Sequence, residues 1–320
     1  MRFDIVKCHG SGNDFPLIDA RRIALGEAEW AAVARTLADR RGPIGGDGIL
    51  LLGAGDNDHQ FSMVMRNSDG SEAETCLNGL RCVARMGFEA LGIDDTRVRL
   101  KMSSATVARD ADIAAGVYTV REVAGPVSLD AAAWPLGDET EVIERRVDVL
   151  PSERKFTAIA MPNPHLVSFV ERIDEVELVA IGAACEAAPD WLPNRANVSF
   201  VEMRGPGADG TDLFVRTFER GVGLTDSCGS AMAASTYAAC LTGRVAWGRT
   251  ITVFNRGGMV RAAADRSGAG SVTLSGNATI EWRGSVEVDI AGERASDLVI
   301  EARADDEAAA WAALVERISV

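Results

Sequence analysis

The segments EAETCLNGLRC (residues 72–82) and GLTDSCGSAMA (residues 223–233) each place a cysteine, with small or polar neighbours, directly before an apolar segment. After Cys76, apolar residues recur at helical spacing, and Gly92 stands where such a helix would end. A second apolar segment of similar length follows Cys228. The spacing therefore predicts two core helices, one in each half of the chain, that each begin at a cysteine.

The composition limits the classes of protein to which the chain can belong. Its 320 residues are 47% hydrophobic, which suffices for one large or two medium domains with proper cores. Lys and Arg number 33 against 47 Asp and Glu, giving a net charge of −14 that disfavours binding to nucleic acid. A small anionic substrate stays compatible with this charge, because local donors can outweigh the overall field.

No targeting or membrane segment is visible in the sequence. The start, MRFDIVKCHG, lacks the apolar centre of a secretory signal, and no segment reaches the ~18 apolar residues of a membrane span. Six cysteines are spread along the chain without a CxxC pair, which disfavours a disulfide scaffold or a zinc site. We therefore expect reduced thiols in the cytoplasm, no membrane partner and no metal.

Strands and loops are expected around the two cysteine-headed helices. Residues 28–41 predict an amphipathic helix, and residues 42–52 a glycine-rich turn that enters a buried strand. This turn lacks the Gly-Lys-Ser/Thr ending of a phosphate-binding loop, so Asp47 within it is expected to be structural. A change of domain is expected within residues 122–145, and residues 305–318 predict a terminal amphipathic helix.

A cysteine at a helix start has a distinct chemical environment. The positive end of the helix dipole lowers a thiol pKa, and the unpaired N–H groups there bind a carboxylate. Isolated buried cysteines are more often small core residues, so the pairing of two similar junctions is what favours catalysis. If both helix starts faced one cavity, one thiolate could remove a proton and the other thiol could deliver one to the opposite face. Such a pair could invert a stereocentre.

Several segments resemble the diaminopimelate epimerase family of pyridoxal-independent two-cysteine enzymes. They occur in the order typical of the family, between about residues 3 and 285. The Asn-x-Asp-Gly-Ser-Glu…Cys and Glu-Arg-Gly…Cys-Gly patterns are the most specific of them. The matching segments are KCHGSGNDF (7–15), GPIGGDGILLL (42–52), RNSDGSEAETCLNGLRC (66–82), MPNPHLVSFV (161–170), RANVSFVE (195–202) and FERGVGLTDSCGS (218–230).

The resemblance implies a role for each matching position. Cys76 and Cys228 would form the catalytic thiolate and thiol pair. Arg220 would hold the distal carboxylate of the substrate, Glu219 would meet a substrate ammonium, and His165 would lie close to the reacting amino acid. The α-carboxylate would bind at the two helix starts, at Asn78, Gly79, Gly229 and Ser230. The amide side chains lining the substrate pocket would be Asn13, Asn67, Asn163 and Asn197.

The resemblance also implies an α/β (α+β) fold of two pseudo-symmetric domains. Each would be a barrel-like, mostly antiparallel sheet wrapped round a central helix. Residues 1–125 plus 281–320 would form the domain that carries Cys76, and residues 126–280 the domain that carries Cys228. The expected ligand is a small amino-acid substrate without a cofactor, and assembly as a homodimer is a further expectation.

The activity implied by the resemblance is epimerisation of L,L-diaminopimelate to meso-diaminopimelate, in lysine and peptidoglycan biosynthesis. Four positions depart from the family pattern: Leu77 and Pro162 replace usual glycines, Leu224 an acidic residue, and Ala231 a glycine. The tail beyond about residue 290 is also longer than usual. Two alternatives therefore stay open, namely racemisation of another amino acid such as histidine, and a catalytically silent amino-acid-binding relative. Proline lacks a polar distal end for Arg220 to hold, which disfavours a proline racemase.

Overall fold

The computed structural model describes residues 1–320 except 74–75, 102, 208–209 and 319–320. Glu74 and Thr75 of the first cysteine motif thus lie outside the described residues. The chain divides into two compact units, unit 1 (residues 1–122 with 275–320) and unit 2 (residues 123–274). The expected domain changes, after residues 125 and 280, lie a few residues beyond these divisions.

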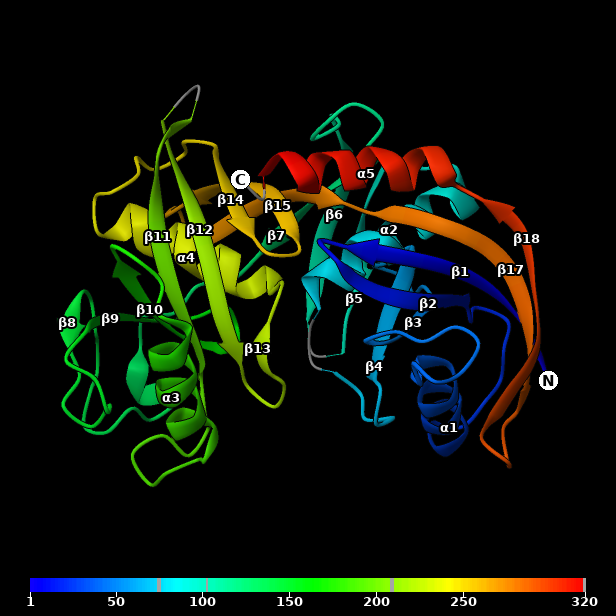
Figure 1. The fold of residues 1–320 in the computed structure, drawn as a ribbon, viewed down its shortest axis with the longest axis horizontal. Coiled ribbons are helices and arrows are strands. Elements are labelled where there is room, and N and C mark those ends of the chain that lie inside the picture. The colour runs from blue at the N-terminus through cyan, green and yellow to red at the C-terminus, as the bar shows by residue number, and fades with distance from the viewer. Residues whose placement is uncertain (74–75, 102, 208–209, 319–320) are drawn as a thin grey trace. The chain divides into compact units, whose positions relative to one another are not determined.

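Unit 1 is a curved ladder of strands around one buried helix, α2 (Figure 1). The strands β1–β2, β3–β4 and β5–β6 pair antiparallel, while β2–β3 and β4–β5 pair parallel across an intervening helix. The elements up to residue 124 are β1 (Arg2–Gly10), β2 (Asn13–Asp19), α1 (Glu27–Ala38), β3 (Gly48–Ala54), β4 (Phe61–Asn67), α2 (Leu77–Leu91), β5 (Asp95–Arg99), β6 (Ser104–Asp110) and β7 (Thr119–Ala124). The end of the chain adds β16 (Ser271–Asn277), β17 (Thr279–Asp289), β18 (Arg294–Arg303) and α5 (Asp305–Ile318).

Unit 2 repeats this order of strands and helices. Here β9–β10, β11–β12 and β14–β15 pair antiparallel, while β10–β11 and β12–β14 pair parallel across a helix. The helix α4 contacts strands β9 to β12 and β15, as α2 contacts β1 to β4 and β6 in unit 1. The elements are a 3-10 turn (Ala131–Ala133), β8 (Arg145–Arg146), β9 (Lys155–Ala160), β10 (Pro164–Val170), α3 (Glu175–Glu186), β11 (Asn197–Gly207), β12 (Gly210–Glu219), β13 (Gly223–Thr225), α4 (Gly229–Leu241), β14 (Ile251–Asn255) and β15 (Gly258–Asp265).

The predicted fold class is confirmed, because each unit is a mostly antiparallel sheet with an apolar helix at its centre. The helix α2 begins at Cys76 and ends at Gly92, whose left-handed backbone satisfies the last turn through a bond to the Phe88 carbonyl. Its regularly spaced apolar residues, which include Leu80, Val83 and Phe88, are buried up to the last turn, where Leu91 is exposed. Periodic burial, rather than helix propensity alone, therefore fixes this element.

The outer helices and the tail show what the periodicity predicts and what it misses. The expected helix over residues 28–41 is α1, which buries Trp30, Val33 and Leu37. The helix α3 was not predicted, although Asp174 caps it by accepting bonds from the backbone N–H groups of residues 176 and 177. The expected terminal helix is α5.

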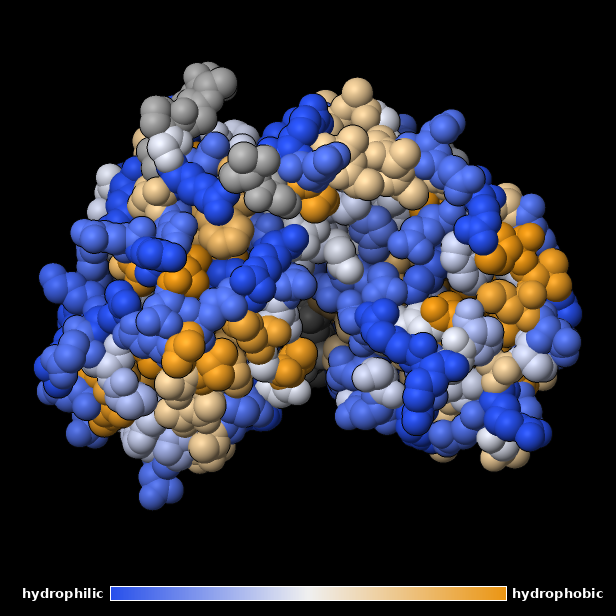
Figure 2. Space-filling model, in the orientation of Figure 1, coloured by the Kyte–Doolittle hydropathy of each residue, from blue (hydrophilic) through white to orange (hydrophobic). Residues whose placement is uncertain are grey.

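The tail also contributes the strand β18, which pairs antiparallel with β17. Its side chains Val299 and Ile300 are exposed, and Figure 2 shows apolar surface gathered over β17 and β18. Across the described part of the chain, no helix combines the length and the apolarity that crossing a bilayer requires.

Candidate active site

One group of predicted residues, called the first half-site below, lies at the start of α2 and comprises Cys76, Asn78, Gly79 and Asn13. Cys76 is the N-cap residue, and its Sγ accepts a hydrogen bond from the Gly79 backbone N–H at 3.3 Å. Asn78, in the first turn, donates from Nδ2 to Oδ1 of Asn13 at 2.7 Å. A Cβ on Gly10 would lie 2.4 Å from the Asn78 carbonyl oxygen, so only glycine lets the end of β1 approach this turn. The structure thus brings four predicted residues of unit 1 together at one helix start.

Asn13 and Asn67 differ in how they relate to this helix start. Asn13 donates to Oδ2 of Asp47 at 2.9 Å, so Asp47 anchors an amide of the half-site and is structural in that sense. Asn67, at the end of β4, instead donates from Nδ2 to Ser71 Oγ at 3.0 Å within the turn that follows the strand. Asn67 therefore shapes the segment that leads toward Cys76.

A buried polar network that the sequence did not predict supports Asn78. Arg81 is completely buried and donates to Oδ1 of Asn78 at 2.8 Å. It also pairs with the equally buried Glu122 at 2.7 Å and donates to the Asn277 carbonyl at 3.0 Å. Burial raises the pKa of the Glu122 carboxyl to about 7, although the Arg81 charge opposes the shift. The only hint in the sequence is an arginine on the apolar helix, because its partners lie far away along the chain.

The second predicted half-site lies at the start of α4, where Cys228 is the N-cap residue and Gly229 the first helical residue. The Cys228 Sγ lies 3.5 Å from Ser230 Oγ, which also accepts a bond from Asn163 Nδ2 at 3.3 Å. Asn163 immediately precedes β10, whose second residue is His165. The His165 Nε2 lies 3.2 Å from Asn163 Oδ1, so these side chains form one connected set.

Further predicted residues extend this set along β11 and β12. Asn197, the first residue of β11, lies beside His165 with its Nδ2 at 3.5 Å from Nε2. Its Oδ1 accepts the backbone N–H of Arg220 at 2.8 Å, and the Arg220 guanidinium donates to the Asn194 carbonyl at 3.1 Å. Glu219, the last residue of β12, accepts a bond from Thr225 Oγ1. All the predicted residues of unit 2 therefore lie in one neighbourhood.

The electrostatics of Cys228 correct one expectation. A helix start was expected to lower the thiol pKa, but burial raises the pKa of Cys228 well above its ordinary value. The Glu219 carboxylate raises it further, while bonds from Ser230 and the Ala231 backbone lower it. Desolvation thus outweighs the helix start and favours the thiol form of Cys228.

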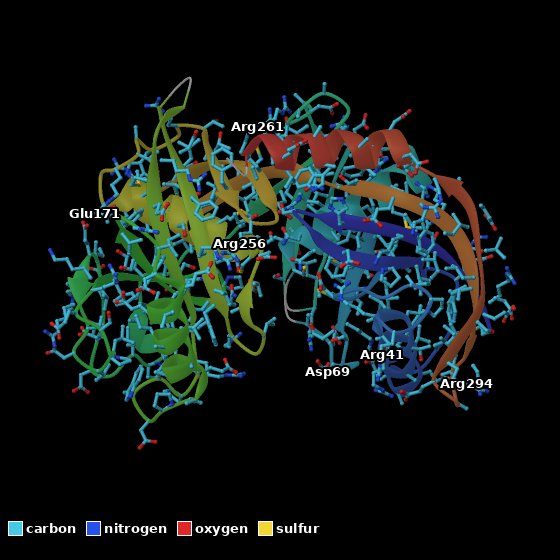
Figure 3. All side chains as sticks on the ribbon, in the orientation of Figure 1. Arg41, Asp69, Glu171, Arg256, Arg261 and Arg294 are labelled. Atoms are coloured by element: carbon cyan, nitrogen blue, oxygen red, sulfur yellow. The ribbon has the colours of Figure 1, made fainter. Side chains whose placement is uncertain are left out.

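Arg216 is a second buried cation that the sequence analysis missed. It is only 2% exposed and donates to the Thr225 carbonyl at 2.8 Å and to Glu175 at 2.9 Å. Arg256, labelled in Figure 3, pairs with the same Glu175 at 2.7 Å. These bonds tie the segment that leads into Cys228 to the start of α3, and so fix the entry to the second half-site.

The departures from the family pattern are accommodated in different ways. Leu77 and Ala231 are both buried within the first turns of their helices. Leu224 packs against the apolar cluster of unit 2, whereas Pro162 is exposed. Three of the four replacements therefore contribute apolar packing.

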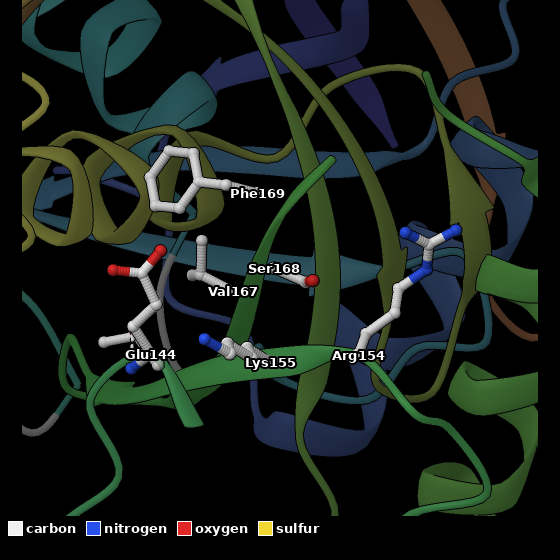
Figure 4. Close-up of a pocket in the computed structure, with 7 residues that line it drawn as sticks. Glu144, Arg154, Lys155, Val167, Ser168 and Phe169 are labelled. Carbon is white, nitrogen blue, oxygen red and sulfur yellow. Dashed lines mark hydrogen bonds between the residues drawn. The ribbon is translucent and has the colours of Figure 1, made fainter. Parts of the chain in front are cut away.

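A pocket in unit 2 lies apart from these residues. Charged side chains at the start of β9 and residues near the end of β10 line it, including Arg154, Lys155, Ser168 and Phe169 (Figure 4). His165 lies at the opposite end of β10, and none of the predicted site residues lines the pocket. The pocket is therefore not the candidate active site.

The burial of His165 predicts how the stability of the folded protein depends on pH. The side chain is fully buried, and desolvation, followed by the Arg220 charge, lowers its pKa to about 3. The unfolded chain binds the proton at an ordinary pKa near 6.5, so stability is intact above that pH and falls as the pH drops toward 3. We expect a slope of about 1.4 kcal/mol per pH unit from this histidine between pH 6 and 4.

Urea unfolding of the wild type and of His165→Gln at several pH values measures this slope. Burial lowers the pKa of His9 to about 4, so His9 contributes a similar slope that both proteins share. In the variant, the free energy of unfolding should depend less steeply on pH, because the contribution of His165 is gone. Identical slopes in the two proteins would mean that His165 is not buried in its neutral form.

Comparisons with known proteins first define the class by its fold. The crystal structure of the Bacillus anthracis phenazine biosynthesis protein of the PhzF family matches with a TM-score of 0.65. The match covers 90% of this chain and 100% of that chain at 13% identity, so it shows a shared fold. The chain is thus an α/β protein of the PhzF-like fold.

Sequence comparisons then define the family. The family model described as diaminopimelate epimerase matches residues 5–119 and 157–281. The Clostridium acetobutylicum diaminopimelate epimerase is 39% identical, over 90% of this chain and 87% of its own length. The Lactiplantibacillus plantarum diaminopimelate epimerase is 36% identical, over 87% and 88% respectively. The chain belongs to the diaminopimelate epimerase family, and the predicted resemblance is confirmed.

Proposed function

We propose that this protein is an isomerase that converts L,L-diaminopimelate to meso-diaminopimelate with two cysteines and no cofactor. The observation that carries the proposal is the duplicated cap, because Cys76 and Cys228 each occupy the N-cap position of a core helix. Membership of the family supports the choice of substrate, since relatives 39% and 36% identical carry that name.

The reaction needs a base and an acid on opposite faces of one α-carbon. One thiolate takes the α-proton as the C–H bond breaks, and the electron pair stays on the α-carbon. The other cysteine then gives its S–H proton to the opposite face, so the two sulfurs exchange protonation states. An amino-acid α-proton is a weaker acid than a thiol by about a dozen pKa units, or about 16 kcal/mol. Backbone N–H groups of the helix starts, aimed at the substrate carboxylate, would supply much of this stabilisation.

The surroundings of the two sulfurs suggest which one starts as the acid. Burial and Glu219 favour the protonated form of Cys228, the form that donates a proton. The Cys76 sulfur is less buried and accepts a backbone N–H bond, a contact that stabilises a thiolate. We therefore propose that Cys76 starts the reaction as the base and Cys228 as the acid.

The amides and Arg220 would recognise the rest of the substrate. The guanidinium of Arg220 suits the distal carboxylate of diaminopimelate, and Glu219 suits an ammonium. Asn163 and Asn197 add oriented donors and acceptors without charge. A substrate without a polar far end would leave these groups unpaired, which is the expected basis of selectivity.

The test is solvent exchange in deuterated water. Incubation with L,L-diaminopimelate should yield the meso isomer with deuterium at the inverted α-carbon, as measured by NMR and mass spectrometry. L-Histidine, supplied in parallel, should take up no α-deuterium. Exchange of histidine alone would identify the racemase alternative, and exchange of neither substrate would indicate a silent binding protein.

We also infer a cytoplasmic location, because both catalytic thiols must stay reduced to carry protons. Assembly as a homodimer stays a prediction, and the size of the particle in solution would test it.

A further inference from the structure

The C-terminal segment lies beyond the part of the chain that matches the family, because the family model ends at residue 281. Its helix α5 packs against other elements of unit 1 through a few specific contacts. The Trp311 side chain is 7% exposed, and its ring contacts the His9 ring of β1 at a tilt of 56°, with centroids 5.6 Å apart. Glu307 pairs with Arg85 of α2 and accepts the Ile280 N–H at 3.0 Å. The segment is therefore anchored both to β1 and to the helix that carries the first half-site.

The His9 ring is the first member of a buried chain of hydrogen bonds that leads to Asn78. Asn277 lies with its Nδ2 at 3.2 Å from His9 Nδ1, and its Oδ1 accepts the Ser11 N–H at 2.7 Å. The Asn277 carbonyl accepts from Arg81 Nε at 3.0 Å, and the same guanidinium donates to Asn78 Oδ1 at 2.8 Å. Each member of this chain is less than a tenth exposed.

We propose that α5 acts as a brace, a helix that keeps the first half-site ordered. Within α5, Trp311 is a positioning residue that acts on Asn78 through the hydrogen-bond chain of His9, Asn277 and Arg81. The physical reason is the exclusion of water, since a polar network holds its members firmly only while no solvent competes for its bonds. The indole ring lies against the His9 ring at an angle of 56°, and both side chains are less than a tenth exposed, so Trp311 helps to keep water away from this end of the network. Because Asn78 is proposed to hold the substrate carboxylate, the effect on catalysis rests on the proposed function, whereas the effect on the order of α2 does not.

The test compares three full-length variants. Trp311→Ala removes the ring, Trp311→Phe keeps an aromatic face, and Leu314→Ala truncates another buried apolar residue of α5. Hydrogen exchange of the peptide covering residues 76–91 reports the order of α2, which includes the first turn, without any substrate. We expect exchange there to become about tenfold faster in Trp311→Ala, with Leu314→Ala and Trp311→Phe close to the wild type.

Steady-state kinetics with L,L-diaminopimelate give the second measurement. The kcat/KM of Trp311→Ala should fall by about tenfold through both a higher KM and a lower kcat, since the carboxylate is held in the ground state and more strongly as charge develops in the transition state. Leu314→Ala should stay within about twofold of the wild type even where its unfolding midpoint drops. Trp311→Leu, which keeps apolar volume without the ring, replaces the alanine variant if that variant does not fold.

Two outcomes would overturn the brace. Equal acceleration of exchange in Trp311→Ala and Leu314→Ala would mean that α5 only adds general stability. Unchanged exchange and kinetics in the ring-deleted variants would mean that Asn78 is held without the tail. A wild type that does not epimerise diaminopimelate would refute the proposed function, and the exchange comparison would still decide whether α5 orders the first half-site.

Discussion

Replacement of Cys76 or Cys228 by serine is expected to lower the rate of diaminopimelate epimerisation by about 10²–10⁴-fold in each case. Serine preserves the shape of the side chain, but its hydroxyl is too weak an acid and its alkoxide too scarce near neutral pH. Both faces of the α-carbon need a proton carrier, so either loss stops inversion. Coupled or NMR assays of the L,L and meso isomers measure the rates directly.

Solvent exchange separates the two-base mechanism from a general loss of structure. With one cysteine left, the variant should still wash deuterium slowly into the one isomer whose α-proton faces that sulfur, with retention of configuration. Cys240→Ser serves as the matched control, because Cys240 is a buried thiol of the same helix α4 that lies in its last turn. Normal turnover by either helix-start variant would contradict the mechanism.

The two core helices on which this prediction depends could be predicted from the sequence, because the residues that determine them are close together along the chain. Apolar spacing predicted both core helices and placed Cys76 and Cys228 at their starts, as the structure shows for α2 and α4. The amides of unit 2 cluster around Cys228 in the structure, although their roles toward a substrate stay predictions. Local sequence thus predicted the two core helices and the positions of the cysteines at their starts.

Properties that depend on burial or on partners far away along the chain could not be predicted from local sequence patterns. Arg81 bonds Glu122 and Asn277, which lie 41 and 196 residues away along the chain, so no local pattern announces the network. The pKa of Cys228 was predicted in the wrong direction, because the helix start is a local feature whereas desolvation depends on the whole fold. The short helix α3 was missed because its apolar face is weakly patterned and its cap is a single aspartate.

The second large effect is expected from the buried ion pair of Arg81 and Glu122. Arg81→Met is expected to lower the free energy of unfolding by about 3–5 kcal/mol, because it leaves the Glu122 carboxylate buried without its cation. It should also lower the activity, since Asn78 loses the guanidinium that holds its side chain. Chemical denaturation and steady-state kinetics on the same preparation measure both effects.

The pH dependence and a double variant test the cause. Burial raises the folded-state pKa of Glu122 to about 7, above its ordinary value of 4.5, so the folded protein binds this proton more tightly than the unfolded chain. This pKa already includes the lowering effect of Arg81, so removal of Arg81 should raise it further. Wild type and variant then lose stability alike as the pH rises from 4.5 toward 7, and only the variant goes on losing it above 7, so the deficit of Arg81→Met should be larger at pH 8 than at pH 5. Arg81→Met with Glu122→Leu removes both charges and should recover much of the stability but not the activity. A double variant that recovers both would mean that Arg81 stabilises unit 1 without positioning Asn78.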